Sequence, residues 1–175
     1  MIQHLTIRKT TQRDLDAVMG IIAEAVKSLR SRGVDQWQDG YPNAAAIQAD
    51  MEAGISYVAC LDSAGKEQIL GTAAISFAPE PTYREIYDGA WRAEKPYAVI
   101  HRIATAEAYK GCGVATALLE FVRKSCRERG VSWIRIDTHR DNLVMKKFLE
   151  KEGFRRCGSI TLDSGAHRFG FDAEV

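Results

Sequence analysis

Residues 97–129 constrain the fold of this chain more than any other stretch. Residues 97–104 mix β-branched, aromatic and small side chains, which predicts a largely buried strand. Residues 114–122 carry apolar side chains at i, i+3, i+4, i+7 and i+8, which predicts an amphipathic helix. Gly111 and Gly113 lie just before that helix. The stretch therefore predicts a strand, a Gly-x-Gly turn and a helix in close succession.

This arrangement has two interpretations. A backbone without Cβ lets a ligand come close. The first N–H groups of a helix have no partners within it and lie at the positive end of its dipole. A phosphate satisfies both conditions, so the turn predicts an anion-binding loop. The alternative is a tight strand-to-helix turn that binds no ligand.

The overall composition limits the class of protein. The chain has 175 residues, which predicts one domain with a sizeable core. A net charge of +1 gives no electrostatic reason to expect nucleic acid or an anionic membrane as a partner. No apolar run approaches the roughly 20 residues that span a bilayer, and no signal sequence is evident. We therefore expect no nucleic-acid partner and no membrane segment.

The four cysteines are scattered, without a C-x-x-C pair. They are Cys60, Cys112, Cys126 and Cys157. This spacing argues against a zinc site or a disulfide framework and is typical of a reducing compartment. We expect no bound metal and a cytoplasmic location.

Periodicity and turn residues predict the remaining elements. In order they are a strand at 5–7, helices ending at Gly33 and Gly54, hairpin strands at 57–61 and 69–77, a strand at 133–137, a helix opening at 141–142, and two strands on either side of 163–165. Large aromatic residues gather in two intervening loops, at 37–41 and 82–96. Each aromatic group predicts either a small structural core or the wall of a binding site.

The residues around the two glycines resemble a family signature. Residues 110–115 read KGCGVA and resemble the Q/R-x-x-G-x-G/A signature of the GNAT superfamily of acyl-CoA-dependent N-acetyltransferases. Lys110 stands where glutamine or arginine is usual, so it keeps a positive charge without the bidentate geometry of arginine. The order of elements is similar to this family over nearly the whole chain.

The resemblance implies an α/β (α+β) fold in which residues 1–175 form a single domain. It implies a mixed central sheet of about seven strands flanked by about four helices. The sheet is expected to be splayed between its fourth and fifth strands.

The resemblance also implies acetyl-CoA as the acetyl donor. Its pyrophosphate would be held by the backbone amides of residues 111–116, with Lys110 adding charge. Its pantetheine arm would pair with the backbone of residues 103–105, where a free N–H would also stabilise an oxyanion. Asn142 matches a family asparagine that contacts the cofactor, and it could also cap a helix. The predicted cofactor-binding residues are Ile103, Ala104, Thr105, Lys110, Gly111, Cys112, Gly113, Val114, Ala115, Thr116 and Asn142.

Transfer to an amine needs a group that takes a proton. An alkyl amine with a pKa of about 10.4 is mostly ammonium at pH 7, and forming the neutral amine costs roughly 4–5 kcal/mol. A base or a water relay is therefore expected. His101 is the first candidate, because arylalkylamine acetyltransferases of this superfamily place a histidine at the corresponding position of the strand. The alternative is a hydrogen-bonded core histidine. His139 is the second candidate base, followed by Asp137 and Glu107.

One position departs from the family pattern. Many members have a tyrosine four residues before the Gly-Phe that ends the motif, placed to protonate the leaving thiolate. The corresponding residue here is Leu149, which cannot donate a proton. Another group or water protonates the thiolate, or it leaves as the anion.

The predicted function is an N-acetyltransferase that moves an acetyl group from acetyl-CoA directly to a primary amine. The acceptor is a small molecule or a peptide, with a small amine favoured because the loop aromatics suit cation–π contact. One alternative is a non-catalytic acyl-CoA-binding sensor or interaction module. Another is a dinucleotide-binding oxidoreductase unit in which Asp137 would hold a ribose. In such a unit the strand runs straight into the first glycine, whereas here residues 105–110 separate the two, which argues against this alternative. The sequence leaves monomer and homodimer open.

Overall fold

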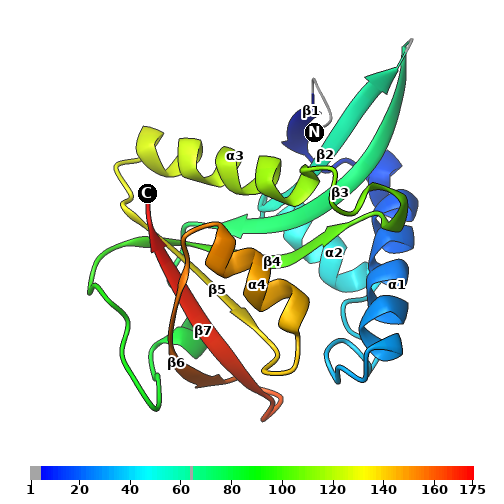
Figure 1. The fold of residues 1–175 in the computed structure, drawn as a ribbon. Helices are drawn as coiled ribbons and strands as arrows, with labels where there is room; N and C mark the ends of the chain where they lie inside the picture. Colours follow the sequence, from blue (N-terminus) through cyan, green and yellow to red (C-terminus); the bar gives the residue numbers. More distant parts are fainter. Residues whose placement is uncertain (1–4, 64) are drawn as a thin grey trace. The chain divides into compact units, whose positions relative to one another are not determined.

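The computed structural model describes residues 5–63 and 65–175 and shows a mixed α/β fold (Figure 1). The strands are β1 (Leu5–Lys9), β2 (Ser56–Ser63), β3 (Lys66–Ser76), β4 (Tyr97–Thr105), β5 (Trp133–Thr138), β6 (Arg155–Thr161) and β7 (His167–Glu174). The α-helices are α1 (Leu15–Ser31), α2 (Ala44–Glu52), α3 (Val114–Glu128) and α4 (Leu143–Lys151). Short 3₁₀ helices lie at η1 (Gln12–Asp14), η2 (Pro81–Tyr83) and η3 (Glu107–Tyr109).

The strands follow the order β1-β2-β3-β4-β5-β7-β6. The β4–β5 pair is parallel, and its register runs from Tyr97↔Trp133 to Ile100↔Ile136. The pairing ends there, although β4 continues to Thr105. The predicted seven-stranded sheet with an opening between its fourth and fifth strands is therefore confirmed.

By its internal contacts the chain groups into two compact units. The first unit contains the residues up to Ile75 and Arg102–Val122, and the second contains Ser76–His101 and Arg123–Val175. Strand β4 contributes to both units, because the boundary falls between His101 and Arg102. The assignment of residues 1–175 to one functional domain stays a prediction.

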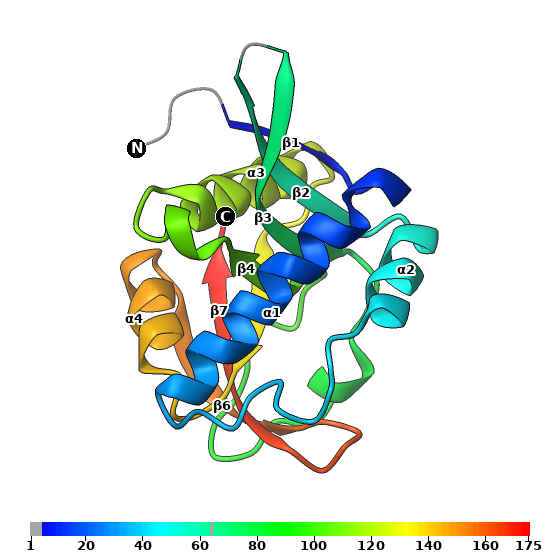
Figure 2. The same ribbon diagram turned by 90° about the vertical axis from the view of Figure 1, so that its right-hand side faces the viewer.

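Two helices cover one face of the strands in the first unit. Figure 2 shows α1 in front of β2 and β3, with α2 beside it. Buried apolar side chains from α1, α2, β2 and the end of β4 form one core: Val18, Ile21, Ile22, Ile47, Val58, Cys60 and Ala104. Burial of such side chains is worth about 1.5–3 kcal/mol each, which exceeds what helix propensity contributes.

The beginning of α3 packs closely on β3 in the same unit. A Cβ placed on Gly71 would lie 2.7 Å from Cγ1 of Val114 and 3.5 Å from Cδ1 of Leu118. The ring of Phe121 lies 5.2 Å from that of Tyr57 in β2. A residue without a side chain at position 71 therefore lets the helix that follows the Gly-x-Gly turn approach the sheet.

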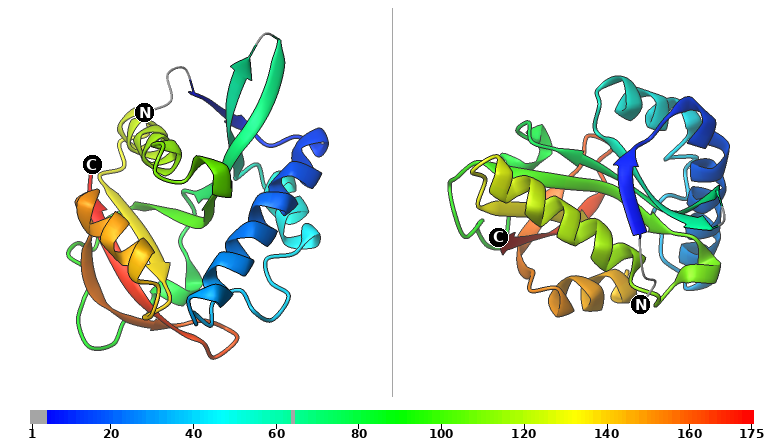
Figure 3. Two further views of the ribbon diagram at one scale, coloured as in Figure 1. Left: turned by 45° about the vertical axis from the view of Figure 1, so that its right-hand side comes forward. Right: turned by 90° about the horizontal axis from the view of Figure 1, so that it is seen from above.

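The second unit is layered around β5, β7 and β6. Helix α4 lies over β5 and β7 in both Figure 1 and the left view of Figure 3. The segment between β3 and β4 supplies Tyr83, which forms a buried cluster with Val99 and Ile160. The indole N–H of Trp91 donates to the Tyr83 carbonyl at 2.9 Å. These contacts make Tyr83 and Trp91 parts of a structural core.

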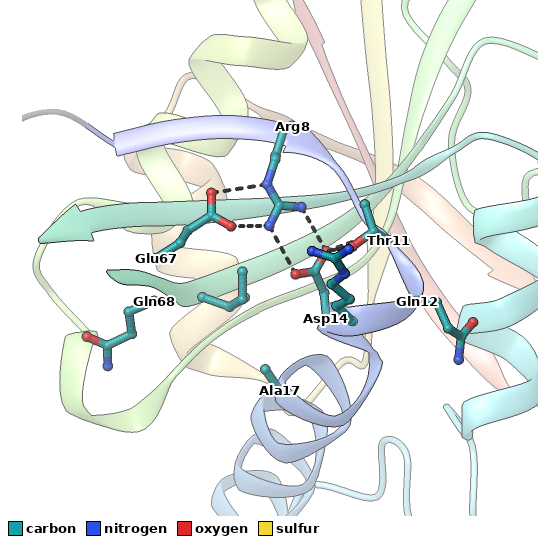
Figure 4. Close-up of a pocket in the computed structure, with 9 residues that line it drawn as sticks. Arg8, Thr11, Gln12, Asp14, Ala17, Glu67 and Gln68 are labelled. Carbon is teal, nitrogen blue, oxygen red and sulfur yellow. Dashed lines mark hydrogen bonds and ion pairs between the residues drawn. The ribbon is translucent and has the colours of Figure 1, made fainter. Parts of the chain in front are cut away.

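An ion-pair cluster fixes the start of α1 to the strands of the first unit. Both terminal nitrogens of Arg8 bond to Asp14, at 2.7 and 3.0 Å, and its Nε bonds to Glu67 in β3 at 3.1 Å (Figure 4). Asp14 also accepts the backbone N–H of Thr11 at 2.7 Å. Hydrogen bonding from Arg8 lowers the pKa of Asp14 to about 2, although burial opposes this shift.

We predict that Asp14→Asn destabilises the protein in a pH-dependent way. Because the carboxyl pKa is depressed on folding, the stabilisation is present above the ordinary value of 3.8 and is lost as the pH falls through about 2. The free energy of unfolding should fall by about 2 kcal/mol at pH 6, and the difference should shrink toward pH 2. Urea titrations at several pH values measure this effect. Glu67→Gln, at an exposed partner of the same arginine, is the control and should cost less. An equal loss at every pH would contradict the prediction.

Candidate functional site

The predicted cofactor loop lies at the start of α3 in the first unit. The helix begins at Val114, and its first bond runs from the N–H of Ala117 to the Gly113 carbonyl at 2.9 Å. The amides of Gly113, Val114 and Ala115 therefore precede the first intrahelical bond. Gly111 and Gly113 have φ values of 76° and 91°, which glycine adopts without a Cβ penalty. This turn fits a phosphate group, because its amides lie at the positive end of the helix dipole.

The residues just before this turn are tied to α1. The Lys110 ammonium donates to Oγ of Ser28 at 2.8 Å and forms an ion pair with Glu107. The backbone N–H of Glu107 donates to Oε2 of Glu24 at 2.7 Å. A carboxylate thus already pairs with the charge that Lys110 was expected to add.

The amide of Cys112 also has a partner inside the turn. Its N–H donates to the Tyr109 carbonyl at 3.2 Å, while its Sγ lies 3.8 Å from the Lys110 carbonyl oxygen. Of the amides predicted to bind pyrophosphate, this one is therefore already used by the fold. Thr116 lies in the first turn of α3, as expected.

The predicted backbone segment of Ile103, Ala104 and Thr105 forms the end of β4. Ala104 is buried with the α1 and α2 side chains, whereas its two neighbours are partly exposed. The next residue, Ala106, donates its N–H to the Leu70 carbonyl at 2.9 Å, which attaches the end of the strand to β3. Because its side chain is buried, Ala104 could contact a ligand only through its backbone.

The histidine predicted as the base lies in the second unit and is hydrogen-bonded. Nε2 of His101 lies 3.0 Å from Oε2 of Glu80, and the two side chains are 23% and 21% exposed. The other oxygen of Glu80 accepts from the N–H of Thr82 at 3.2 Å and from its hydroxyl at 2.8 Å. Hydrogen bonding from His101 is the largest effect that lowers the pKa of Glu80 to about 2. Glu80 is therefore an anion at neutral pH and can only accept a hydrogen bond. In the neutral ring Nε2–H donates to it, and Nδ1 is then the nitrogen without a proton.

Sequence reasoning did not identify Glu80. It lies 21 positions from His101, so no local periodicity connects the two residues. The one local signal is its place directly before Pro81, where it caps the η2 helix. A carboxylate in a rigid capped turn is a fixed hydrogen-bond acceptor.

Two other candidate bases have bonded positions in the second unit. Nδ1 of His139 accepts the backbone N–H of Asp141 at 3.2 Å, in the turn before α4. The Tyr83 hydroxyl donates to Oδ2 of Asp137 at 2.8 Å. Burial raises the pKa of Asp137, and burial also raises the pKa of Tyr83. Both candidates thus have structural hydrogen bonds in the part of the chain that is described.

Asn142 and Leu149 are two further positions singled out by the sequence. Oδ1 of Asn142 accepts the N–H of Met145 at 3.2 Å, and its Nδ2 donates to the Thr138 hydroxyl at 3.2 Å. Asn142 therefore caps α4, while its contact with a cofactor stays a prediction. Leu149 is fully buried.

The described residues were compared with the requirements of a metal site and of a membrane span. Among the described residues no group of three or more His, Cys, Asp or Glu is placed to hold a metal ion. In the same part of the chain no helix is long and apolar enough to span a membrane.

The pocket in Figure 4 is lined by Arg8, Thr11, Gln12, Arg13, Asp14, Ala17, Glu67, Gln68 and Ile69. None of these is a predicted site residue, and the carboxylates of Asp14 and Glu67 meet the charge of Arg8.

Comparison with known proteins identifies the family. The sequence model of the acetyltransferase (GNAT) family matches residues 22–154. The chain is 24% identical over 162 residues to YesJ, an uncharacterized N-acetyltransferase of Bacillus subtilis (strain 168), covering 89% of this chain and 83% of YesJ. A GNAT-family acetyltransferase from Streptococcus agalactiae 2603 has a similar structure, with a TM-score of 0.86, 31% identity, and coverage of 100% and 98% of the two chains.

A third protein shows the same fold at lower identity. The PaiA N-acetyltransferase from Thermoplasma acidophilum, whose structure contains coenzyme A, matches with a TM-score of 0.69 and 14% identity over 99% and 100% of the chains. The fold and the family model together define an acyltransferase of the α/β class. This chain belongs to the GNAT acetyltransferase family.

We predict that Gly113→Ala lowers the affinity for coenzyme A by roughly tenfold or more, because a Cβ would occupy the approach to the first-turn amides. Gly130→Ala is the matched control, since Gly130 also has positive φ and follows the other end of α3. Both variants should lose some thermal stability from backbone strain, but only the first should lose affinity. Isothermal titration calorimetry with coenzyme A measures the difference. Equal affinities would exclude the loop as the phosphate site.

Proposed function

We propose that this protein transfers an acetyl group from acetyl-CoA directly to a primary amine. The observation that carries the proposal is the glycine turn at the start of α3, where the amides of Gly113, Val114 and Ala115 precede the first intrahelical bond. The coenzyme A in the related PaiA structure supports the same ligand class. The thioester of acetyl-CoA supplies an activated acetyl group.

The backbone of the first unit would hold this donor. The amides at the start of α3 bind the pyrophosphate, and the backbone of residues 103–105 pairs with the pantetheine amides as an added strand would. An N–H of this segment donates to the thioester oxygen, which stabilises the negative charge that develops there. Binding relies mainly on backbone groups, so side-chain substitutions in the loop should matter less than changes at the glycines.

His101 would serve as the base. Its Nδ1 accepts the proton that the amine loses while the C–N bond forms and the C–S bond breaks. Glu80, held by its bonds to Thr82, orients the ring through Nε2, in the way that an aspartate orients the histidine of a catalytic triad. The buried side chain of Leu149 cannot protonate the leaving thiolate, so the thiolate would leave as the anion or take its proton from water or another group.

The acceptor we propose is a small primary amine. Tyr41, in the loop between α1 and α2, is 40% exposed. The guanidinium of Arg102 already lies 5.8 Å from the centre of its ring, so an acceptor ammonium would contact the remaining exposed surface of the ring. Incubation of the protein with acetyl-CoA and a panel of amines, followed by free thiol and by mass of the products, tests this. We expect thiol release coupled to N-acetylation of small amines, with weaker activity on peptides. Coenzyme A binding with no thiol release on any amine would favour the acyl-CoA sensor instead.

We predict that His101→Ala lowers kcat by about 10²-fold without changing coenzyme A affinity. In the wild type kcat/KM should rise with pH as the base loses its proton, and this rise should be absent in the variant. Glu80 cannot cause it, because its pKa is lowered to about 2 and it stays ionised throughout.

Glu80→Gln separates the orienting role from the basic role. The amide can keep the bond to His101 while it loses the charge, so kcat should fall by roughly tenfold and the pH dependence should persist. Thermal melting of both variants controls for folding. Full activity and an unchanged pH profile in His101→Ala would refute its role as the base.

A further inference from the structure

One residue of β4 has a backbone conformation that is unusual for a strand. Arg102 has φ of +53°, in the left-handed region that residues with a Cβ avoid. It lies two residues after Ile100, the last β4 residue paired with β5. It directly precedes Ile103, the first residue of the predicted ligand-binding backbone. A left-handed residue changes the direction of the chain, so the conformation at 102 sets where the next peptide groups point.

The side chain of Arg102 is anchored on α2. Its Nε donates to Oδ2 of Asp50 at 2.7 Å, and its NH2 forms an ion pair with the other carboxylate oxygen. The two side chains are 15% and 8% exposed, so this bidentate pair is largely removed from water. The Asp50 backbone carbonyl accepts the N–H of Ile55 at 2.8 Å, which fixes the residue that carries the carboxylate.

A second contact holds the same guanidinium. Its NH1 donates to the Tyr41 hydroxyl, and the guanidinium carbon lies 5.8 Å from the centre of the Tyr41 ring. Three nitrogens of one side chain are thus bonded to two separate segments of the first unit. Such a planar fork fixes orientation more strictly than a single ammonium contact would.

The Arg102–Asp50 ion pair contributes more to the orientation of β4 than to the stability of the fold. Desolvation of two charges offsets most of their attraction, so a buried ion pair contributes little net stability compared with apolar packing. Its directional bonds nevertheless restrict where the strand can lie. A strained backbone conformation persists only where surrounding contacts over-determine it, and here those contacts come from Asp50 and Tyr41.

We propose that Arg102 is a positioning residue whose bonds to Asp50 and Tyr41 hold β4 in its left-handed turn and so present the backbone of residues 103–105 to the acyl-CoA arm. The identity of that ligand rests on the proposed function. The guanidinium itself does not contact the ligand in this proposal. Its effect passes through the conformation of its own backbone.

The comparison of glycine with alanine at position 102 tests this proposal. Both substitutions remove the guanidinium, but only glycine adopts positive φ without a Cβ penalty. Arg102→Ala should lower the affinity for coenzyme A by about tenfold, and Arg102→Gly should regain most of it. In steady-state kinetics the KM for acetyl-CoA should rise in Arg102→Ala, while the KM for the amine stays unchanged.

Asp50→Asn provides a second measurement that does not depend on those two variants. It should weaken coenzyme A binding while Arg102 is present, and it should have no effect on affinity when combined with Arg102→Gly. This pattern would show that Asp50 acts only through the conformation at 102. Melting temperatures identify any variant that loses affinity by unfolding, and the double variant removes the unpaired carboxylate that Arg102→Gly leaves.

Two outcomes would overturn the proposal. Equal loss of affinity in Arg102→Gly and Arg102→Ala would show that backbone conformation is not the cause. A rise in the KM for the amine in both would instead make the guanidinium a contact for the acceptor. Because coenzyme A affinity is measured without turnover, a wild type that binds coenzyme A but acetylates nothing would refute the proposed function and leave this test valid.

Discussion

The end of the β4–β5 pairing at Ile100 is the constraint on which the candidate site depends. In a regular central strand the backbone N–H and C=O groups are taken by the two neighbouring strands, and none is left for a ligand. Strand β4 follows this rule over Tyr97–Ile100 and then continues to Thr105 beyond the end of that pairing. This strand end is the backbone that we propose pairs with an extended ligand.

Two consecutive residues after this point are each held by a carboxylate from outside the strand. His101 bonds to Glu80, which lies in the capped turn before η2, and Arg102 bonds to Asp50 in α2. The first interaction fixes the orientation of the imidazole ring that we propose as the base. The second fixes the direction of the backbone that follows. Fixed side-chain geometry is what catalysis by proximity requires, since small displacements of reacting groups cost large factors in rate.

Local sequence signals predicted the elements and the glycine turn before α3. The apolar spacing of residues 114–122 and the preceding glycines predicted the start of α3, and Val114 is its first residue. The order of strands and helices and the opening between the fourth and fifth strands also followed, through the family resemblance that the GNAT sequence model confirms. These features are predictable because the periodicity of apolar side chains and the chemistry of turns depend on neighbours within a few positions.

The sequence by itself determined the fold class, the family and the place of the glycine loop, because each is written in short-range patterns. It left open whether Trp91 lined a site. It did not reveal that Glu80, placed before Pro81, bonds to His101, or that Arg102 donates to Asp50. The tertiary structure decided these points: the Trp91 ring packs so closely on β7 that a Cβ at Gly170 would lie 2.7 Å from it. The bonded pairs join residues 21 and 52 positions apart. Side-chain partners so distant in the chain are brought together only by packing, and no periodicity in the sequence records which residues will meet.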